Sequence, residues 1–184
     1  MNVTRVLCDT KFIQLKGTPA KSGNEWVYAH RPNADDIVII LPYTEEEILF
    51  IIEERPPIIA EGRGTYSIGL VAGLVGDVRK NETIEDAIRC ELLEEAGLVA
   101  ESIEIKSRKV ASSPGCTSEV CTIAFAKIKD KMPVQEPVTD GGIIVDRVWV
   151  KRNNIFNWLK EKEAEGCVLT AHALATMFYL FEVK

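Results

Sequence analysis

One stretch, residues 76–98, constrains the fold more than any other part of the 184-residue chain, and it reads GDVRKNETIEDAIRCELLEEAGL. Thr83 can cap the first turn of a helix, and Asp86, three residues on, completes a capping-box pattern. Gly97 can take the left-handed conformation that ends a helix. The pattern therefore predicts a helix from Ile84 to Ala96 with a local signal at each end.

Two acids of this helix lie on the face expected to point into the protein. Ile88 and Leu92 mark an apolar stripe, Glu91 and Glu95 fall inside it, and Glu94 falls at its edge. Acids on a helix are usually solvated surface, but like charges repel more strongly where water is excluded. A divalent cation would remove that repulsion, and carboxylate oxygens suit Mg²⁺ or Mn²⁺ rather than zinc. The stripe therefore predicts a metal site.

The same stretch resembles the signature of the Nudix hydrolases. The chain has eight of the nine fixed positions at the required spacing: Gly76, Glu82, Glu91, Leu92, Glu94, Glu95, Gly97 and Leu98. The one departure is Cys90, where the family has Arg. The resemblance implies an α/β (α+β) fold, with a mixed β-sheet sandwiched between α-helices. It also implies Mg²⁺, with Mn²⁺ as the alternative, bound by Glu91, Glu94, Glu95 and the backbone carbonyl of Ala72.

Runs of β-branched and aliphatic residues between turn residues predict the other elements. The predicted strands are residues 3–15, 26–31, 36–41, 48–53, 66–74, 102–110, 120–128 and 143–150, and two more helices are predicted at 155–164 and 170–181. We divide the chain into N-terminal strands, residues 1–33, and a Nudix hydrolase domain, residues 34–184. The resemblance implies that the N-terminal strands cross to a second subunit of a homodimer.

Four residues outside the signature resemble the branch of the family that acts on ADP-ribose and other ADP-sugars. Pro114 lies in a Ser-Pro-Gly turn 16 residues past the signature, is followed by Ser118, and resembles the hallmark of that branch. Without the signature, the same residues would indicate only a turn between two strands. Trp26 resembles a tryptophan that stacks on the adenine base, although it could simply pack on the domain. Arg55, before two prolines, resembles an Arg beside the substrate phosphates, where a guanidinium fork fits well; an isolated Arg is otherwise a surface charge.

Two further departures fall where the family does its chemistry. Relatives usually carry Glu at the position of Gly69, and they place a catalytic Glu on a loop near the positions of Gly141 and Gly142. The acids that remain around this loop are Glu136, Asp140 and Asp146, each a candidate base for taking the proton of an attacking water. The predicted catalytic residues are Glu94, Glu95, Glu136 and Asp140.

Composition excludes several other classes. The net charge is −6 and no basic run is present, which argues against a nucleic-acid partner. Five cysteines, an odd number without zinc-finger spacing, predict neither a disulfide framework nor a structural zinc site. The first residues lack the layout of a signal peptide and no apolar run reaches membrane length, so we expect a cytoplasmic location and no membrane partner.

Two hypotheses of function follow. The first is Mg²⁺-dependent hydrolysis of the pyrophosphate bond of ADP-ribose or a related nucleoside diphosphate sugar, which gives AMP and a sugar phosphate. The second is a catalytically weakened Nudix domain that binds an ADP-sugar or another protein. The retained acids favour the first hypothesis, and the departures at Cys90, Gly69 and Gly141-Gly142 favour the second.

Overall fold

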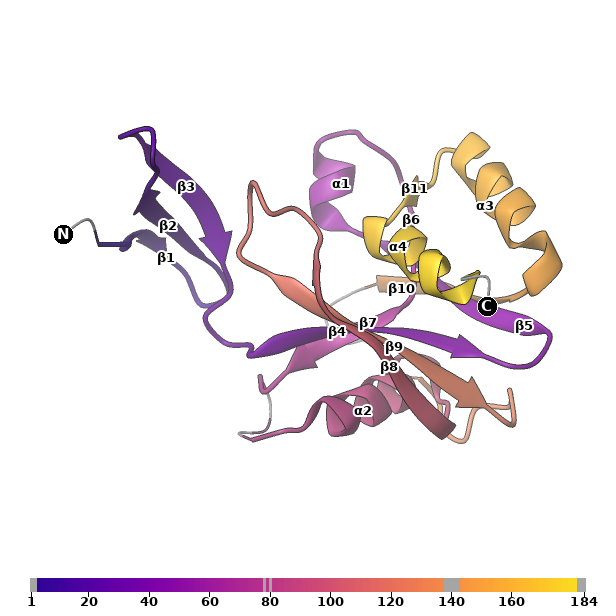
Figure 1. The fold of residues 1–184 in the computed structure, drawn as a ribbon. Helices are drawn as coiled ribbons and strands as arrows, with labels where there is room; N and C mark the ends of the chain where they lie inside the picture. Colours follow the sequence, from indigo (N-terminus) through magenta and orange to yellow (C-terminus); the bar gives the residue numbers. More distant parts are fainter. Residues whose placement is uncertain (1–2, 78, 80, 138–142, 182–184) are drawn as a thin grey trace.

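The computed structural model describes residues 3–77, 79, 81–137 and 143–181. The N-terminal strands form a small antiparallel sheet of their own, set to one side of the main body in Figure 1. Its strands, in spatial order, are β1 (Arg5–Asp9), β2 (Gln14–Pro19) and β3 (Glu25–His30). The division of the chain at residue 33 stays a prediction.

The main body contains an eight-stranded mixed sheet. Its strands are β4 (Asp36–Tyr43), β5 (Glu47–Glu54), β6 (Ser67–Gly69), β7 (Val71–Val75), β8 (Ala100–Ala111), β9 (Val120–Ile128), β10 (Ile143–Lys151) and β11 (Val168–Leu169). The order is β11-β6-β5-β4-β9-β8, with β10 also paired to β5 and β7 also paired to β4. The β4–β9 and β6–β11 pairs are parallel, and the other pairs are antiparallel.

Helices cover both faces of this sheet, as Figure 1 shows. They are α1 (Pro56–Ala60), α2 (Ile84–Ala96), α3 (Ile155–Ala164) and α4 (Ala171–Leu180), with a 3₁₀ turn at Arg152–Asn154. The helix α2 lies on one face, and α3 and α4 lie on the other. The predicted mixed sheet between helices is confirmed.

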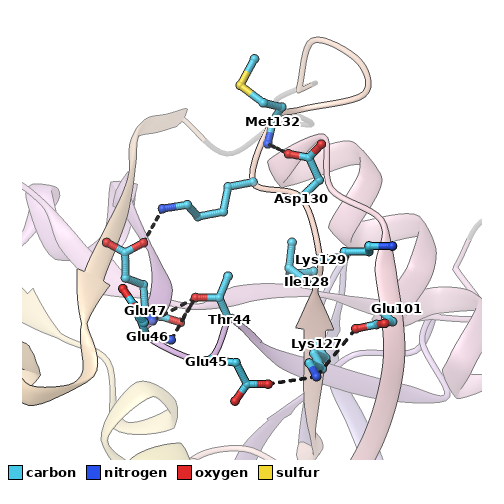
Figure 2. Close-up of a pocket in the computed structure, with 11 residues that line it drawn as sticks. Thr44, Glu45, Glu46, Glu47, Glu101, Lys127, Ile128, Lys129, Asp130 and Met132 are labelled. Atoms are coloured by element: carbon cyan, nitrogen blue, oxygen red, sulfur yellow. Dashed lines mark hydrogen bonds and ion pairs between the residues drawn. The ribbon is translucent and has the colours of Figure 1, made fainter.

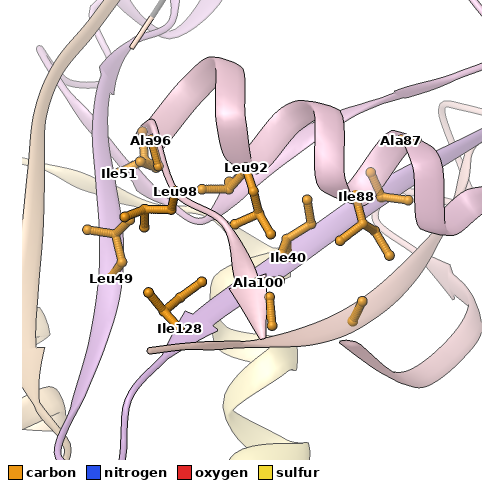
Figure 3. Close-up of a cluster of buried hydrophobic side chains, with 14 of the residues drawn as sticks. Ile40, Leu49, Ile51, Ala87, Ile88, Leu92, Ala96, Leu98, Ala100 and Ile128 are labelled. Carbon is orange, nitrogen blue, oxygen red and sulfur yellow. The ribbon is translucent and has the colours of Figure 1, made fainter. Parts of the chain in front are cut away.

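Strand alternation divides the core into two layers, because successive side chains point to opposite faces of a sheet. On β4, Val38 and Ile40 pack toward α2, whereas Ile39 and Leu41 pack toward α3 and α4. Figure 3 shows the α2 layer, where Ile88 and Leu92 of the helix contact side chains of the sheet. The apolar stripe predicted for the helix therefore faces the core.

Two predicted strands were each wrong in extent. Residues 3–15 form two strands, because Thr10 turns the chain by bonding the backbone of Ile13. Residues 66–74 are split at Leu70, because β6 pairs with β5 whereas β7 pairs with β4. The short elements α1 and β11 were not predicted, and no helix in the described ranges is long and apolar enough to cross a membrane.

Candidate functional site

The helix α2 positions the predicted acids, and its ends are those that the sequence indicated. The Thr83 hydroxyl accepts a hydrogen bond from the Asp86 backbone, and the Asp86 carboxylate accepts one from the Thr83 backbone, which completes the capping box. Gly97 ends the helix with φ 68°, in the left-handed region. These local bonds fix the rotation and length of the helix, so that Glu91 and Glu95 face β7.

Glu91 lies directly against the backbone of β7. A Cβ atom placed on Gly73 would be 1.8 Å from Glu91 Oε1, so only glycine leaves room for this carboxylate. Partial burial, together with the negative charges of Glu95, Glu94, Asp77 and Glu82, raises the pKa of Glu91 to about 8. The carboxylate therefore lies in a region where a positive charge would be strongly favoured.

Glu95, one turn later, bonds the neighbouring residue of the same strand. Its Oε2 accepts a hydrogen bond of 3.2 Å from the backbone N–H of Ala72. Burial is the main reason that the pKa of Glu95 is raised to about 7. The charge of Glu53 adds to this rise, whereas the Ala72 bond and the charges of Arg55 and Arg147 oppose it. The two half-buried acids of α2 thus lie against the backbone of residues 72 and 73.

Glu94 and Glu82 occupy the rim of this group. Glu94 is exposed, and its Oε1 accepts a hydrogen bond of 3.3 Å from the Cys90 thiol. Burial is the main cause that raises the pKa of the Cys90 thiol, and the bond to Glu94 is the second. The thiol therefore stays protonated and acts as a donor. Glu82 accepts a hydrogen bond of 3.1 Å from the Gly76 backbone and so closes the loop before the helix.

Sequence reasoning missed two charged residues beside Glu95. Glu53 of β5 is only 6% exposed, and its Oε1 pairs with Arg55 Nε at 2.8 Å. Arg147 of β10 donates from Nε to the backbone carbonyl of Glu95. Its Nη2 is buried without a hydrogen-bond partner in the described part of the chain. The available signal for Glu53 was its place directly after the apolar run of residues 48–52. Nothing in the sequence marked Arg147.

A crystal structure of an ADP compounds hydrolase is similar to this chain, with a TM-score of 0.72 and 18% identity, over 98% of this chain and 90% of that one. This chain has the Nudix fold. No protein-family model and no curated protein matches the sequence. The structural likeness establishes the architecture, whereas the roles of individual residues depend on their own geometry.

Within the Nudix fold, the candidate base Glu136 lies on the loop before β10. Backbone and side-chain bonds hold residues 134 and 135 to the C-terminal end of α2: Val134 N–H donates to the Gly97 carbonyl at 2.8 Å, and Gln135 Nε2 donates to the Leu93 carbonyl at 3.3 Å. Glu136 follows directly and is exposed. Asp140, with Gly141 and Gly142, lies outside the described residues. Asp146 is exposed, and its Oδ1 accepts a bond from the Arg147 backbone.

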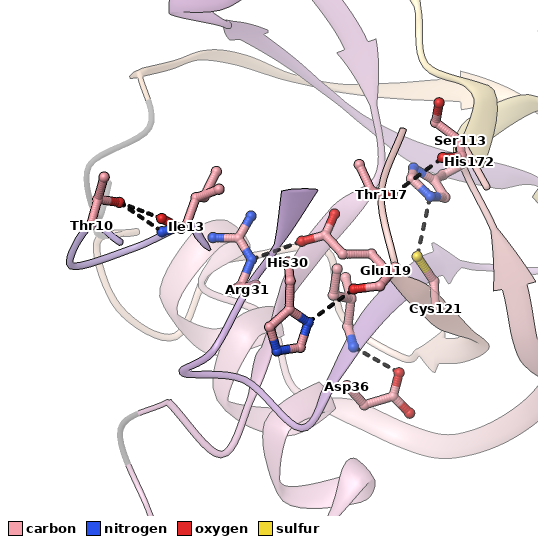
Figure 4. A network of polar contacts seen from close by, with 12 residues as sticks. Thr10, Ile13, His30, Arg31, Asp36, Ser113, Thr117, Glu119, Cys121 and His172 are labelled. Atoms are coloured by element: carbon pink, nitrogen blue, oxygen red, sulfur yellow. Dashed lines mark hydrogen bonds and ion pairs between the residues drawn. The ribbon is translucent and has the colours of Figure 1, made fainter. Parts of the chain in front are cut away.

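The remaining predicted binding residues gather where the N-terminal sheet contacts the Nudix body. Trp26 is 53% exposed, and its indole N–H donates to the Gly115 carbonyl at 3.0 Å, next to the exposed Pro114. His30 Nδ1 and Ser118 Oγ are 2.9 Å apart in the network of Figure 4. The structure thus brings Trp26, Pro114 and Ser118 together, whereas Arg55 lies with Glu53 and Glu95.

Two cavities of the described structure lie away from the acids of α2. One of about 680 Å³ opens beside the β4–β5 turn and the end of β9, as Figure 2 shows. Ion pairs cross it, including Lys127 with Glu45 and Lys131 with Glu47, and no predicted site residue lines it. A smaller cavity of about 120 Å³ is lined by Ser118 together with His30, Arg31 and Glu119.

The donor chemistry at α2 suits a hard divalent cation. The charges that raise the pKa of Glu91 are the carboxylates of Glu95, Glu94, Asp77 and Glu82, so a cation would relieve both burial and repulsion. Among the described residues, no three His, Cys, Asp or Glu side chains converge closely enough to form a ready-made metal cage. That arrangement fits Mg²⁺, which usually binds one or two carboxylates plus waters and substrate phosphates.

Proposed function

We propose that this protein hydrolyses the pyrophosphate bond of ADP-ribose or a related nucleoside diphosphate sugar in a Mg²⁺-dependent reaction that gives AMP and a sugar phosphate. The observation that carries the proposal is the placement of Glu91 and Glu95 against residues 72 and 73. Two half-buried carboxylates with pKa values raised to about 8 and 7 are costly to ionise unless a cation binds between them and an anionic substrate.

Glu91, Glu95 and the Ala72 carbonyl would hold the cation, with Glu94 at the exposed rim. When bound, Mg²⁺ neutralises pyrophosphate oxygens and lowers the pKa of an attacking water. Gly73 contributes by its lack of a side chain, which lets Glu91 approach the strand. Capping of α2 at both ends fixes the three acids before substrate arrives, so little reorganisation is needed during the reaction.

The other residues would bind substrate or move the proton. Arg55 is half exposed at the end of β5, close enough to Glu95 for its charge to lower the pKa of Glu95, and it would bind a substrate phosphate. The exposed ring of Trp26, beside Pro114 and Ser118, would stack on the base. Glu136 or Asp140 would accept the proton of the attacking water.

The direct test measures AMP release from ADP-ribose with Mg²⁺, in the parent protein and in the Glu94→Gln and Glu95→Gln variants. We expect release that EDTA abolishes and that each variant lowers by about 100-fold or more. Glu85→Gln, an exposed acid in the first turn of the same helix, is the matched control and should retain the parent rate. Equal rates in parent and Glu95→Gln protein would contradict the proposal.

Cys90 favours a second candidate, an ADP-sugar-binding or interaction module with weakened turnover. The neutral thiol gives Glu94 one weak hydrogen bond, where the signature Arg would give charged ones. Cys90→Arg separates the candidates, because a weakened enzyme should gain rate from the restored charge. An inert parent that binds ADP-ribose in calorimetry, together with an equally inert Cys90→Arg variant, would favour the binding module.

We further propose that the protein is a homodimer built through its N-terminal sheet. Trp26 and His30 share the face that contacts the Nudix body, whereas Leu15 and Val27 share the opposite face and are 41% and 45% exposed. The same face also carries the Arg5–Glu25 ion pair, but a small three-stranded sheet that exposes apolar side chains usually needs a second layer. A second copy of the chain would supply that layer.

A further inference from the structure

Arg147 of β10 is a half-buried cation for which the proposed function has so far given no role. Its Nε donates a hydrogen bond to the backbone carbonyl of Glu95, and its Nη2 is buried without a partner among the described residues. A charged group with a fully buried donor is uncommon unless its charge has a task at that place. The strand that carries Arg147 explains how it comes to face α2.

A bulge in β10 turns the Arg147 side chain toward α2. The pairing of β10 with β5 shifts register between Ile144 and Asp146, where one extra residue is inserted. Ile144 before the bulge and Trp149 after it both pack against the core layer beneath α2, although an odd number of positions separates them. Arg147, two residues before Trp149, therefore shares its face, whereas the exposed Asp146 lies on the other face.

The pairing places Arg147 at the C-terminal end of α2. Its partner in β5 is Ile51, which packs in the core layer beneath the helix. Figure 3 shows Ile51 near Ala96, the last residue of α2. Residues directly opposite each other in a strand pair point to the same face of the sheet. The guanidinium therefore lies between the sheet and the last turn of α2.

The bond from Arg147 satisfies a carbonyl that the helix does not satisfy by itself. The last four carbonyls of a helix have no N–H partner inside the helix. The backbone N–H groups that follow α2 bond the carbonyls of Leu92 and Leu93. The carbonyl of Glu95 instead receives the Arg147 guanidinium, from a residue 52 positions away in the chain. Glu95 is next to the last residue of α2, in the turn where helices fray.

Arg147 also supplies the positive charge that this end of α2 lacks. The C-terminal end of a helix carries a partial negative charge, which a basic residue in the last turn usually offsets. The helix α2 has no basic residue in its last turn, where Glu94 and Glu95 add further negative charge. A cation from β10 is therefore held at this end by electrostatic attraction, and its hydrogen bond is stronger than that of a neutral donor.

The same bond fixes the residue whose side chain reaches β7. The Glu95 carboxylate accepts a hydrogen bond of 3.2 Å from the Ala72 N–H, while the Glu95 carbonyl accepts the bond from Arg147. Glu95 is thus held between β7 and β10. Without the bond to its carbonyl, the last turn of α2 would be free to shift and to carry the carboxylate away from Ala72. A displacement of about 1 Å can cost about 100-fold in rate.

We propose that Arg147 is a positioning residue of the candidate site, which fixes the last turn of α2 so that the Glu95 carboxylate stays against Ala72. This inference rests on the proposed function, because it concerns how one of the proposed acids is held. The alternative is a residue that only stabilises the fold. The buried Nη2 argues against that alternative, because a buried donor that bonds none of the described groups is itself destabilising.

The Ala72 N–H reports the position of Glu95 without any need for activity. Native-state hydrogen exchange of the full chain, followed by NMR, measures how well this N–H is protected. We expect Arg147→Met, which keeps most of the aliphatic side chain but removes the charge and the donor, to speed exchange at Ala72 by about tenfold or more. The amides of the central strand β4 should change much less. Arg147→Lys keeps a charged donor and should stay within a few-fold of the parent.

The control is Arg89→Met, which removes another guanidinium that bonds a backbone carbonyl. Arg89 belongs to α2 and donates from Nη1 to the Ala100 carbonyl at 3.5 Å, so its bond leads to β8 and not to the end of the helix. Its loss should leave exchange at Ala72 as in the parent. Steady-state kinetics add a second measurement: kcat for AMP release should fall by about 10- to 100-fold in Arg147→Met, with a much smaller change in KM.

The outcomes separate this inference from the proposed function. Parent-like exchange at Ala72 in Arg147→Met would overturn the inference, and so would equal acceleration at Ala72 and in β4, which indicates a residue that only stabilises the fold. An unchanged kcat in Arg147→Met of an active enzyme would overturn it as well. Selective acceleration at Ala72 that Arg147→Lys avoids would support it, even if the parent released no AMP. That absence of AMP would overturn only the hydrolytic function.

Discussion

Gly73 shows how much a single residue determines in this site. With no Cβ atom, it allows the Glu91 carboxylate to lie against β7, where any side chain would overlap it. The overlapping atoms belong to the flexible end of Glu91, so the helix itself need not move. The position therefore affects the direction of a carboxylate much more than the stability of the fold.

We accordingly expect Gly73→Ala to displace Glu91 and to lower Mg²⁺-dependent hydrolysis by at least about tenfold, with a change in the free energy of unfolding near 1 kcal/mol or less. Steady-state kinetics and urea unfolding measure the two quantities. In a Glu91→Gln background the same substitution should have little further effect on the rate, because the two changes act on one interaction. Full activity of Gly73→Ala would contradict this geometry.

The raised pKa values of Glu91 and Glu95 predict an unusual dependence of stability on pH. In the unfolded chain a Glu has a pKa of 4.5. In the folded protein the pKa is about 8 for Glu91 and about 7 for Glu95, so both keep their protons to higher pH. Between these values the unfolded state binds fewer protons, so stability falls as pH rises. The loss begins above pH 4.5 and is complete above pH 8.

Thermal unfolding in EDTA from pH 5 to pH 8.5 measures this effect. We expect the midpoint of the parent to fall relative to that of Glu91→Gln as pH rises, because the variant lacks the more strongly shifted group. Adding Mn²⁺ at pH 8 should raise the parent midpoint, because the ion binds the folded state. A difference between parent and variant that does not change with pH would contradict the prediction.

Among the elements of the fold, α2 provides the proposed metal ligands, and local residues cap both of its ends. Glu91 and Glu95 belong to its last two turns, and its first turn is held by the capping box. The loop before β10 bonds to the other end of the helix. The two ends can therefore be perturbed separately.

Thr83→Ala should remove the cap and lower the free energy of unfolding by about 1 kcal/mol. Thr83→Ser keeps the hydroxyl and is the matched control, with a loss of only a few tenths of a kcal/mol expected. Activity well below the unfolding temperature should stay unchanged in both variants, since the acids lie two turns away. Urea unfolding and steady-state kinetics report the two effects, and equal stability of Ala and Ser variants would rule out the cap.

At the scale of the whole molecule, one sheet holds two layers of core and joins elements that are distant in sequence. The strands β5, β7 and β10 come from separate parts of the chain, but all three lead to the acids of α2. Gly73 lies against Glu91, Arg147 bonds the Glu95 backbone, and Arg55, just after β5, acts on Glu95 through its charge. The small N-terminal sheet lies beside this body and joins it where Trp26 and His30 reach Gly115 and Ser118. Its uncovered face leads to the prediction about assembly.

We expect light scattering to give about twice the chain mass of 20.5 kDa. Leu15→Glu combined with Val27→Glu places charges on the uncovered face of the N-terminal sheet and should yield a monomer. Phe178→Glu, at an even more exposed apolar position on α4, is the control and should leave the mass unchanged. A parent protein that is monomeric at all concentrations would contradict the dimer.

The helix α2 and the overall architecture could both be predicted from the amino-acid sequence. Both ends of α2 depend on contacts within four residues, namely the Thr83 cap and the left-handed Gly97, and local signals of this kind can be recognised without tertiary structure. The aliphatic strands were also recognisable, because burial on a sheet favours β-branched residues regardless of the partner strand. The acidic residues in the stripe followed from helical periodicity alone.

The residues that lie beside those acids could be identified only once the chain was folded. The break at Leu70, the short strand β11 and the positions of Glu53 and Arg147 all depend on pairing between strands far apart in sequence. Such pairing depends on the packing of the whole sheet, and the sequence of a single strand does not specify which other strand pairs with it. For the same reason helical periodicity identified Glu95, whereas the pairing of β10 with β5 was needed to place Arg147 at its carbonyl.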